Sequence, residues 1–170
     1  MSKRAAWLFA LVLTFIGIGV VVVRAQMQGP PALRIDIPVT LEKANVVVDA
    51  GHFVLVGQTP FLLGDMKILA NDFKEANTQG HIIAVFHGDA AFLVLNDAAY
   101  NANRHIRTGN PYAKLIADLM AQGVQFELCG ATALANHWNN ADLLPGVKVN
   151  RDAMVRVTQL QQQGYTLIYQ

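Results

Sequence analysis

Residues 110–130 read NPYAKLIADLMAQGVQFELCG, and this stretch contains one helix followed by one strand. Asn110 and Pro111 are typical of a helix start, because proline is favoured at the first helical position. The apolar residues that follow share one helical face: Leu115, Ile116, Leu119 and Met120. A glycine ends the helix, and the apolar run VQFEL then predicts a buried strand that ends at Cys129. The stretch therefore predicts a helix that leads directly into a strand.

The same alternation of strands and helices extends in both directions from this stretch. Five short apolar runs are predicted as strands: residues 46–48, 81–86, 124–128, 147–149 and 165–169. Helices are predicted between them: from Thr59 and Pro60 to Gly80, from Asp89, over 110–123, from 131, and over 151–164 with Asp152 as the cap. This order predicts an α/β fold with a mostly parallel sheet, helices on both faces and right-handed crossovers.

Polar side chains follow three of the predicted strands. The first strand ends at Asp49 with His52 close behind, the second ends at His87, and the third ends at Cys129. Ligands of an open parallel sheet bind at the carboxyl ends of the strands, so these side chains converge on one edge if the strands are neighbours. Cys129 also precedes a predicted helix, whose free N–H groups favour an anion and hence a reactive thiolate. His52 or His87 is then a proton partner or a cationic neighbour of that thiolate.

Each of these residues also has an ordinary structural interpretation. The chain has one cysteine, so the thiol of an exported chain is either buried and inert, paired with another chain, or free to react. A histidine at a strand end often only closes the strand, and Asp49 can cap the turn after its strand. His81 begins a strand and is predicted at the opposite edge of the sheet. No role is assigned to His105 or His137.

The N-terminus predicts export from the cytoplasm. Lys3 and Arg4 precede an uncharged apolar run over residues 5–23. This run fits a signal peptide cleaved after Ala25, and it is also long enough to be an uncleaved membrane anchor. Both interpretations place the following domain in the bacterial periplasm, because positive charge stays on the cytoplasmic side.

The rest of the chain is predicted to form a linker and one domain. Residues 1–25 are followed by a proline-containing linker over 26–43 and by a single domain over 44–170. The net charge is +1 and the basic residues are scattered, so nucleic-acid binding has no electrostatic support.

Four motifs occur in order along this domain: His87 with Gly88, NPYAKLIADLMAQGVQFELCG over 110–130, LLPGVKV over 143–149, and LQQQGYTLIY over 160–169. Together they resemble the DsrE/DsrF-like sulfur-relay family. The resemblance implies a three-layer α/β sandwich with a five-stranded sheet, usually assembled into trimers or hexamers. In sulfur-relay members a cysteine accepts sulfane sulfur as a persulfide and passes it to a partner. Cys129 occupies the cysteine-glycine position of the broader family.

The resemblance and the strand-end positions lead to one hypothesis of function. The exported domain handles sulfane sulfur, with Cys129 as the persulfide-forming acceptor, His52 or His87 tuning the thiolate, and no cofactor. The residues expected to bind around the thiolate are Asp49, Gly88, Gly130, Ala131 and Thr132, the last three through backbone N–H groups. The expected partners are a thiol-bearing sulfur donor or acceptor and further copies of the chain.

Three other classes of function remain open at this point. In the first, the domain is a binding module in which His52, His87 and Cys129 hold copper, zinc or a small ligand. No pair among these residues has a metal-motif spacing such as C-x-x-C. In the second, the domain is a structural subunit with a buried cysteine. Cysteine-hydrolase chemistry, the third, needs a nucleophile, a base and an orienting group within hydrogen-bond reach.

Overall fold

The computed structural model describes residues 33–170. Of these, Val39–Gln170 belong to one compact unit, whereas residues 33–38 belong to a second unit and contain no helix or strand. The predicted signal peptide or membrane anchor over 1–25, and the first part of the predicted linker, lie outside the described residues. No helix within the described part of the chain has both the length and the apolar composition needed to cross a membrane.

Five parallel strands form the central sheet, in the order β6-β5-β4-β1-β7. Their bounds are β1 Lys43–Ala50, β4 Gln79–Phe86, β5 Val124–Cys129, β6 Lys148–Asn150 and β7 Thr166–Tyr169. Two further short strands, β2 Leu55–Val56 and β3 Thr59–Pro60, form a separate antiparallel hairpin. The prediction of a parallel five-stranded sheet is confirmed, and each of the five predicted strands is present.

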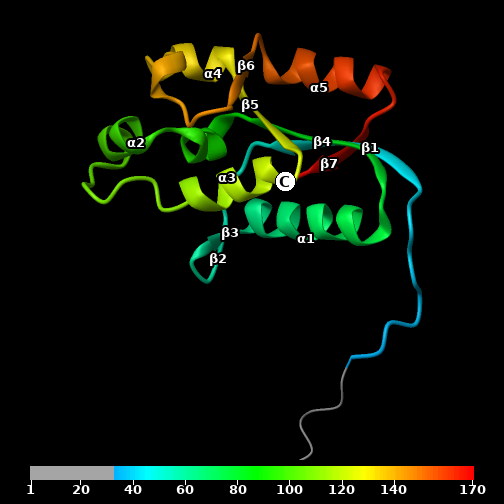
Figure 1. Ribbon diagram of the computed structural model, residues 1–170. Coiled ribbons are helices and arrows are strands. Elements are labelled where there is room, and N and C mark those ends of the chain that lie inside the picture. Colours follow the sequence, from blue (N-terminus) through cyan, green and yellow to red (C-terminus); the bar gives the residue numbers. More distant parts are fainter. Residues whose placement is uncertain (1–32) are drawn as a thin grey trace, which may run out of the picture. The chain divides into compact units, whose positions relative to one another are not determined.

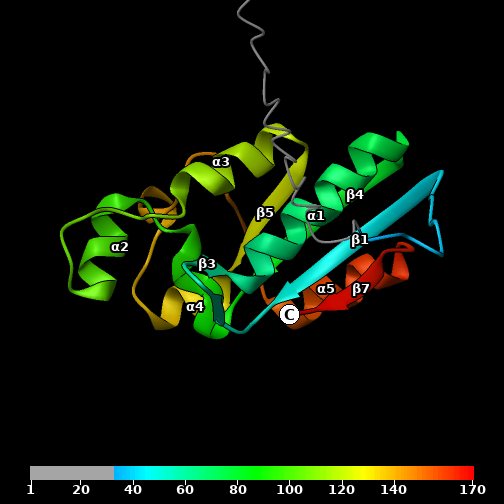
Figure 2. The same ribbon diagram turned by 90° about the horizontal axis from the view of Figure 1, so that it is seen from below.

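Helices cover both faces of this sheet. The α-helices are α1 Phe61–Ala76, α2 Asp97–Arg104, α3 Ala113–Ala121, α4 Gly130–Ala135 and α5 Ala153–Gln162; the 3₁₀ helices are η1 Gly88–Val94 and η2 Asn140–Asp142. Figure 1 shows α1 and α3 on one side of the sheet and α5 on the other. Figure 2 looks from the side of α1 and α3, with α5 behind the sheet. The unit is therefore the predicted three-layer sandwich.

Two apolar clusters fill the space between these layers. The larger cluster lies between the sheet and the α1–α3 layer and includes the stacked rings of Phe86 and Phe126, whose centroids are 5.5 Å apart. The smaller cluster lies between the sheet and α5 and contains Val47, Ile83, Val85, Cys129, Ala153, Val157 and Leu160. Successive strand residues point to opposite faces, so Cys129 faces α5 while Leu128 faces the larger cluster.

The predicted start of the first helix, with Thr59 as N-cap and Pro60 as first helical residue, is one residue too early. Thr59 pairs with Val56 in the β2–β3 hairpin, and α1 begins at Phe61 with Pro60 at its N-cap and no side-chain cap. The Phe61 N–H donates to Val54 O at 2.8 Å. The hairpin therefore satisfies a helix donor that a capping side chain would otherwise take.

Gly80, predicted to end this helix, has a different role. The helix ends at Ala76, and Asn77 adopts the left-handed conformation at φ 52°, which asparagine tolerates better than most residues. Gly80 instead lies in β4 and pairs with Ala44 of β1, where an added Cβ would overlap the Ala44 carbonyl oxygen. A glycine is needed there because the two backbones approach closely.

The single helix predicted from Asp89 is replaced by two shorter helices. Asp89 lies in η1, whereas α2 begins at Asp97 after Asn96, whose side chain accepts a hydrogen bond from Ala99 N–H at 3.0 Å. An isolated β-bridge between Leu95 and Leu143 separates the two helices. Pairing with a residue far along the chain thus interrupts a segment whose local pattern is helical.

Asn110 does not cap α3 in the way its position suggested. The helix begins at Ala113, and Asn110 is buried before it. Its Nδ2 donates to Leu93 O at 2.8 Å and to Leu95 O at 2.7 Å, and its Oδ1 accepts from Tyr112 N–H at 2.9 Å. Asn110 therefore joins the loop before α3 to the end of η1.

Candidate functional site

The carboxyl edge of the sheet brings the predicted site residues onto adjacent strands. Because β4 lies between β1 and β5, His87 after β4 lies between Asp49 near the end of β1 and Cys129 at the end of β5. The register pairs Phe86 with Leu128, and the next residue on each chain segment is His87 or Cys129. The expected neighbouring positions are therefore present, and the chemical roles stay predictions.

Cys129 lies at the N-terminus of α5. It is buried, with 4% of its surface exposed. Its Sγ accepts a hydrogen bond from the N–H of Ala153, the first residue of α5, at 3.3 Å. Asp152 caps this helix, as predicted, by accepting a hydrogen bond from Val155 N–H at 3.2 Å. The free N–H groups and the dipole of α5 favour an anion at the position of this sulfur.

The backbone donors predicted for the thiol lie elsewhere. Gly130, Ala131 and Thr132 form the first turn of α4, but none of their N–H groups donates to Sγ among the hydrogen bonds within residues 33–170. The Cys129 side chain points towards α5, whereas α4 packs through Ala133 against the larger cluster. The helix that follows Cys129 in the chain is therefore not the helix that contacts its sulfur.

The position after Cys129 requires glycine because two backbone oxygens lie close to Gly130. An added Cβ at Gly130 would lie 2.7 Å from Asn150 O and 3.1 Å from Arg151 O. The absence of a side chain lets the segment between β6 and α5 pass close to the end of β5. Gly130 thereby allows the start of α5 to reach Cys129.

His87 is paired with Asp49 rather than with the thiol. His87 Nε2 and Asp49 Oδ1 are 2.6 Å apart, and the side chains are 30% and 18% exposed. The imidazole lies against Gly51, where an added Cβ would be 2.7 Å from Cε1. Gly88 turns the chain away at φ 51°, and its Cβ would be 2.9 Å from Gly51 O. Within residues 33–170 no hydrogen bond joins His87 to Cys129.

His52 is also paired with another residue at this edge. Its Nε2 lies 2.8 Å from the Tyr169 hydroxyl, and the two rings form an edge-to-face pair with centroids 5.7 Å apart. Tyr169 was missed in the sequence, although its place at the end of the last strand was a usable signal. His81 lies near the start of β4, at the opposite edge, as predicted.

The set His52, His87 and Cys129 is not arranged as a metal site. In the described part of the chain, no three or more His, Cys, Asp or Glu side chains are grouped closely enough to hold a metal ion. His87 faces Asp49 and His52 faces Tyr169, whereas the Cys129 thiol faces α5. The geometry therefore gives the copper or zinc interpretation no support.

A buried charged pair lies two residues before Cys129, on the same face of β5. Glu127 is 3% exposed and accepts hydrogen bonds from Arg156 Nε at 2.9 Å and Arg156 Nη2 at 2.8 Å. Gln125 Nε2 and Asn150 Nδ2 also donate to it, at 2.6 and 3.1 Å. Burial raises the pKa of Glu127, but the hydrogen bonds from Arg156, Asn150 and Gln125 and the Arg156 charge outweigh burial and lower it. Arg156 belongs to α5, so this pair joins that helix to the sheet beside Cys129.

A family model settles the relationship of this chain to known proteins. The model of the DsrE/DsrF-like family matches residues 62–169. The chain belongs to the DsrE/DsrF-like family. Membership indicates a sulfur-relay type of function in general terms. No curated protein matches the chain.

Solved structures confirm the DsrE-like fold. A protein of unknown function, MTH1491 from Methanobacterium thermoautotrophicum, is similar with a TM-score of 0.56 and 19% identity, covering 75% of this chain and 98% of that one. The ychN protein from E. coli is similar with a TM-score of 0.51 and 16% identity, covering 75% and 99%. At these identities the similarity shows the fold alone.

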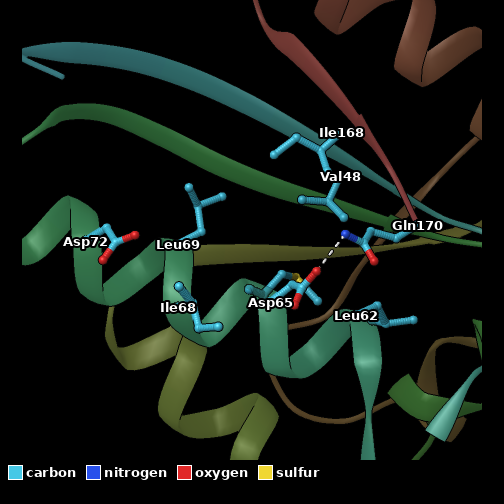
Figure 3. A pocket seen from close by; sticks show the side chains of 9 residues that line it. Val48, Leu62, Asp65, Ile68, Leu69, Asp72, Ile168 and Gln170 are labelled. Atoms are coloured by element: carbon cyan, nitrogen blue, oxygen red, sulfur yellow. Dashed lines mark hydrogen bonds between the residues drawn. The ribbon is translucent and has the colours of Figure 1, made fainter. Parts of the chain in front are cut away.

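A separate pocket of this DsrE-like domain lies on the opposite face of the sheet from Cys129. It has a volume of about 240 Å³ and lies between α1 and strands β1 and β7 (Figure 3). Gln170 Nε2 donates to Asp65 Oδ2 at 3.0 Å across it. Most of its lining is apolar: Val48, Leu62, Met66, Ile68, Leu69 and Ile168. None of the predicted site residues lines it, so it is not part of the Cys129 site.

The Glu127 carboxyl should make the free energy of unfolding of the DsrE-like domain sensitive to acid. Because the folded-state pKa lies below the usual value of 4.5, the carboxylate stabilises the fold above that value. This stabilisation is lost as pH falls through the folded-state pKa. In Glu127→Gln, the free energy of unfolding should therefore change less between pH about 7 and about 3.5 than in the wild type. Urea unfolding at both pH values measures this, with the exposed Glu75→Gln as control; an equal loss in Glu127→Gln and wild type would contradict it.

Proposed function

We propose that the domain is a sulfane-sulfur carrier and that Cys129 carries the sulfur. The Cys129 thiolate attacks the outer sulfur of a donor persulfide, so that a new S–S bond forms at Sγ while the S–S bond of the donor breaks. The donor sulfur leaves as a thiolate and takes up the proton that Cys129 released. An acceptor thiol later removes the carried sulfur by the same exchange. The reaction is balanced without an oxidant or a cofactor.

The hydrogen bond from Ala153 N–H to Cys129 Sγ is the observation that carries this proposal. It supplies a donor at a helix N-terminus, which favours the thiolate form that sulfur exchange requires. The place of Cys129 at the carboxyl end of a central strand, where open α/β sheets bind ligands, also supports it. The sulfur-relay character of the family points the same way.

Burial of the thiol sets a condition on this chemistry. With 4% of Cys129 exposed, a donor reaches Sγ only after the start of α5 moves. His87 and Asp49 are partly exposed polar side chains at the same edge of the sheet, after β4 and on β1. In this proposal they receive the incoming donor, and they act on the thiolate through the surrounding field rather than by direct contact.

The compartment and the partners also belong to the proposal. The charged and then apolar N-terminal sequence supports export to the periplasm, with the domain either released or anchored by residues 5–23. The donor and acceptor are thiol-bearing proteins or small sulfur compounds of that compartment. The domain works as a homo-oligomer, a trimer or a hexamer, as the family resemblance suggests.

Intact mass measurement tests the carrier function. The domain is incubated with polysulfide and then with a reductant, and a gain of about 32 Da per sulfur, reversed by the reductant, is expected. Cys129→Ser should show no gain, and His81→Ala, at the opposite edge, should load as the wild type does. If the wild type gains no mass and its thiol reacts with alkylating reagents only after unfolding, the carrier function is excluded. Cys129 is then a structural core residue.

A further inference from the structure

Two of the three backbone N–H groups in the first turn of α5 have hydrogen-bond partners within residues 33–170. Ala153 N–H donates to Cys129 Sγ at 3.3 Å, and Val155 N–H donates to Asp152 Oδ1 at 3.2 Å. Met154 N–H has no hydrogen-bond partner among residues 33–170. A persulfide on Cys129 adds a second, anionic sulfur next to Sγ. The unpaired Met154 N–H is the next donor of the same helix turn for that sulfur.

This turn is held in place by contacts of charged and polar side chains. The Arg156 guanidinium binds both carboxylate oxygens of Glu127, and Asn150 also donates to that carboxylate. Arg156 lies one turn after Ala153 on α5, and Glu127 lies on the strand that ends at Cys129. The Glu127–Arg156 pair therefore fixes the position of α5 relative to Cys129 Sγ.

An unpaired acceptor also lies beside the thiol. The register pairs Cys129 with Asn150, so that their side chains lie on the same face of the sheet. Asn150 Oδ1 is buried, and it has no hydrogen-bond partner in the described part of the chain. Buried polar atoms are normally paired. An S–H or N–H of an incoming sulfur donor would satisfy this oxygen.

We propose that the N-terminus of α5, and not that of α4, is the anion-stabilising element of the Cys129 site. Ala153 N–H is the catalytic donor to the sulfur, and Glu127 and Arg156 are the residues that position it. This inference deepens the proposed carrier function and rests on it for its chemical purpose. The hydrogen bond itself can be tested without any sulfur donor.

Substitution of Ala153 by proline removes this donor and puts the ring Cδ where the hydrogen points at Sγ, so the sulfur and the start of α5 also have to move apart. Proline is favoured at the first helical position, where the N–H has no partner within the helix. Asp152, which would precede the proline, is already extended at φ −161° and ψ 136°, as a residue before proline requires. Ala153→Ser keeps the N–H and is the matched control.

Removal of the Asp152 charge tests the same site with an expected effect on the thiolate that is opposite to the effect of removing the Ala153 donor. Asp152→Asn keeps a capping side chain but removes a negative charge next to the donor that binds Sγ. Other charged or titratable groups on the elements around the thiol lie on the strands, around the start of α5 and before β7: Asp49 on β1, His87 after β4, Glu127 on β5, Lys148 on β6, Arg151, Arg156, and Tyr165, which packs against the same apolar cluster. Asp118→Asn, on the exposed face of α3, is the matched charge control.

The experiment is an ultraviolet titration of the thiolate in each variant, with the same variant carrying Cys129→Ser as the blank. A single cysteine makes the difference signal specific. In Ala153→Pro, the thiolate fraction at neutral pH should fall about tenfold, which is a shift of about one pH unit in the midpoint. In Asp152→Asn the midpoint should move to lower pH, and in Ala153→Ser and Asp118→Asn it should not move.

Positioning by Glu127 and Arg156 is tested with the same readout. Arg156→Ala should shift the midpoint to higher pH. Arg156→Lys keeps the charge but loses the bidentate contact with Glu127, so its midpoint should lie between those of Arg156→Ala and the wild type. If Ala153→Pro does not fold, the sign of the Asp152→Asn shift decides the result. Unchanged midpoints in Ala153→Pro and Asp152→Asn overturn the inference even if sulfur loads on Cys129. Shifted midpoints with no loading overturn the carrier function instead.

Discussion

Arg156→Ala is expected to lower the free energy of unfolding by about 3 kcal/mol. The substitution leaves the Glu127 carboxylate, which is 3% exposed, without its charged partner. An unpaired buried charge is costly, because the protein interior replaces neither the lost water nor the lost guanidinium. The value lies at the lower end for broken buried pairs, since the Arg156 side chain is 23% exposed. Urea unfolding followed by circular dichroism measures the change.

A solvent-exposed pair provides the matched control for this prediction. Lys114 and Asp118 form an i,i+4 pair on α3 with side chains 85% and 54% exposed. Lys114→Ala should cost no more than about 0.5 kcal/mol. Adding Glu127→Gln to Arg156→Ala should recover part of the loss, because the uncompensated charge is removed. Equal costs for Arg156→Ala and Lys114→Ala would contradict a buried pair at Glu127.

Gly130→Ala is expected to lower the free energy of unfolding by about 1–3 kcal/mol. The added Cβ would meet two backbone oxygens, Asn150 O at 2.7 Å and Arg151 O at 3.1 Å, so a backbone segment has to shift. That segment leads directly into α5. The substitution should therefore also lengthen the contact between Ala153 N–H and Cys129 Sγ, and slow sulfur loading. Urea unfolding and the rate of mass gain with polysulfide measure the two effects.

Gly64→Ala is the matched control for the same change of residue. Gly64 lies inside α1, and the nearest atom to an added Cβ is Thr59 Cγ2 at 4.0 Å. Alanine in a helix interior is favoured over glycine, so Gly64→Ala should stabilise the domain by about 0.5–1 kcal/mol. Loss of stability in Gly64→Ala as large as in Gly130→Ala would show that the contacts at Gly130 are not the cause.

Much of the fold could be predicted from the sequence because its signals are local. The apolar runs that form β1, β4 and β5 are short, β-branched or aromatic, and bounded by glycine or polar residues. Their alternation with helical spacing determines a parallel sheet covered on both faces. The Asp152 cap is equally local, since its side chain bonds a backbone N–H three residues further on.

The errors in element boundaries have a common cause, which is pairing between distant segments. Thr59 follows the rules of a helix cap but pairs with Val56 in a hairpin. The segment from Asp89 has a helical pattern but is divided where Leu95 bridges to Leu143. Neither contact can be inferred from residue spacing, because each depends on where the sheet places the partner.

For the candidate site, the sequence by itself determined that Asp49, His87 and Cys129 lie at the carboxyl ends of three predicted parallel strands, because the order of elements is enough for that. The tertiary structure decided that these three strands are neighbours, in the order β5-β4-β1. Only the tertiary structure decided the partners: Asp49 for His87, Tyr169 for His52, and the start of α5 for Cys129. It also revealed Glu127 and Arg156, which are 29 residues apart. The physical reason is that a side chain's face follows from local periodicity, whereas its partner depends on which element packs against that face.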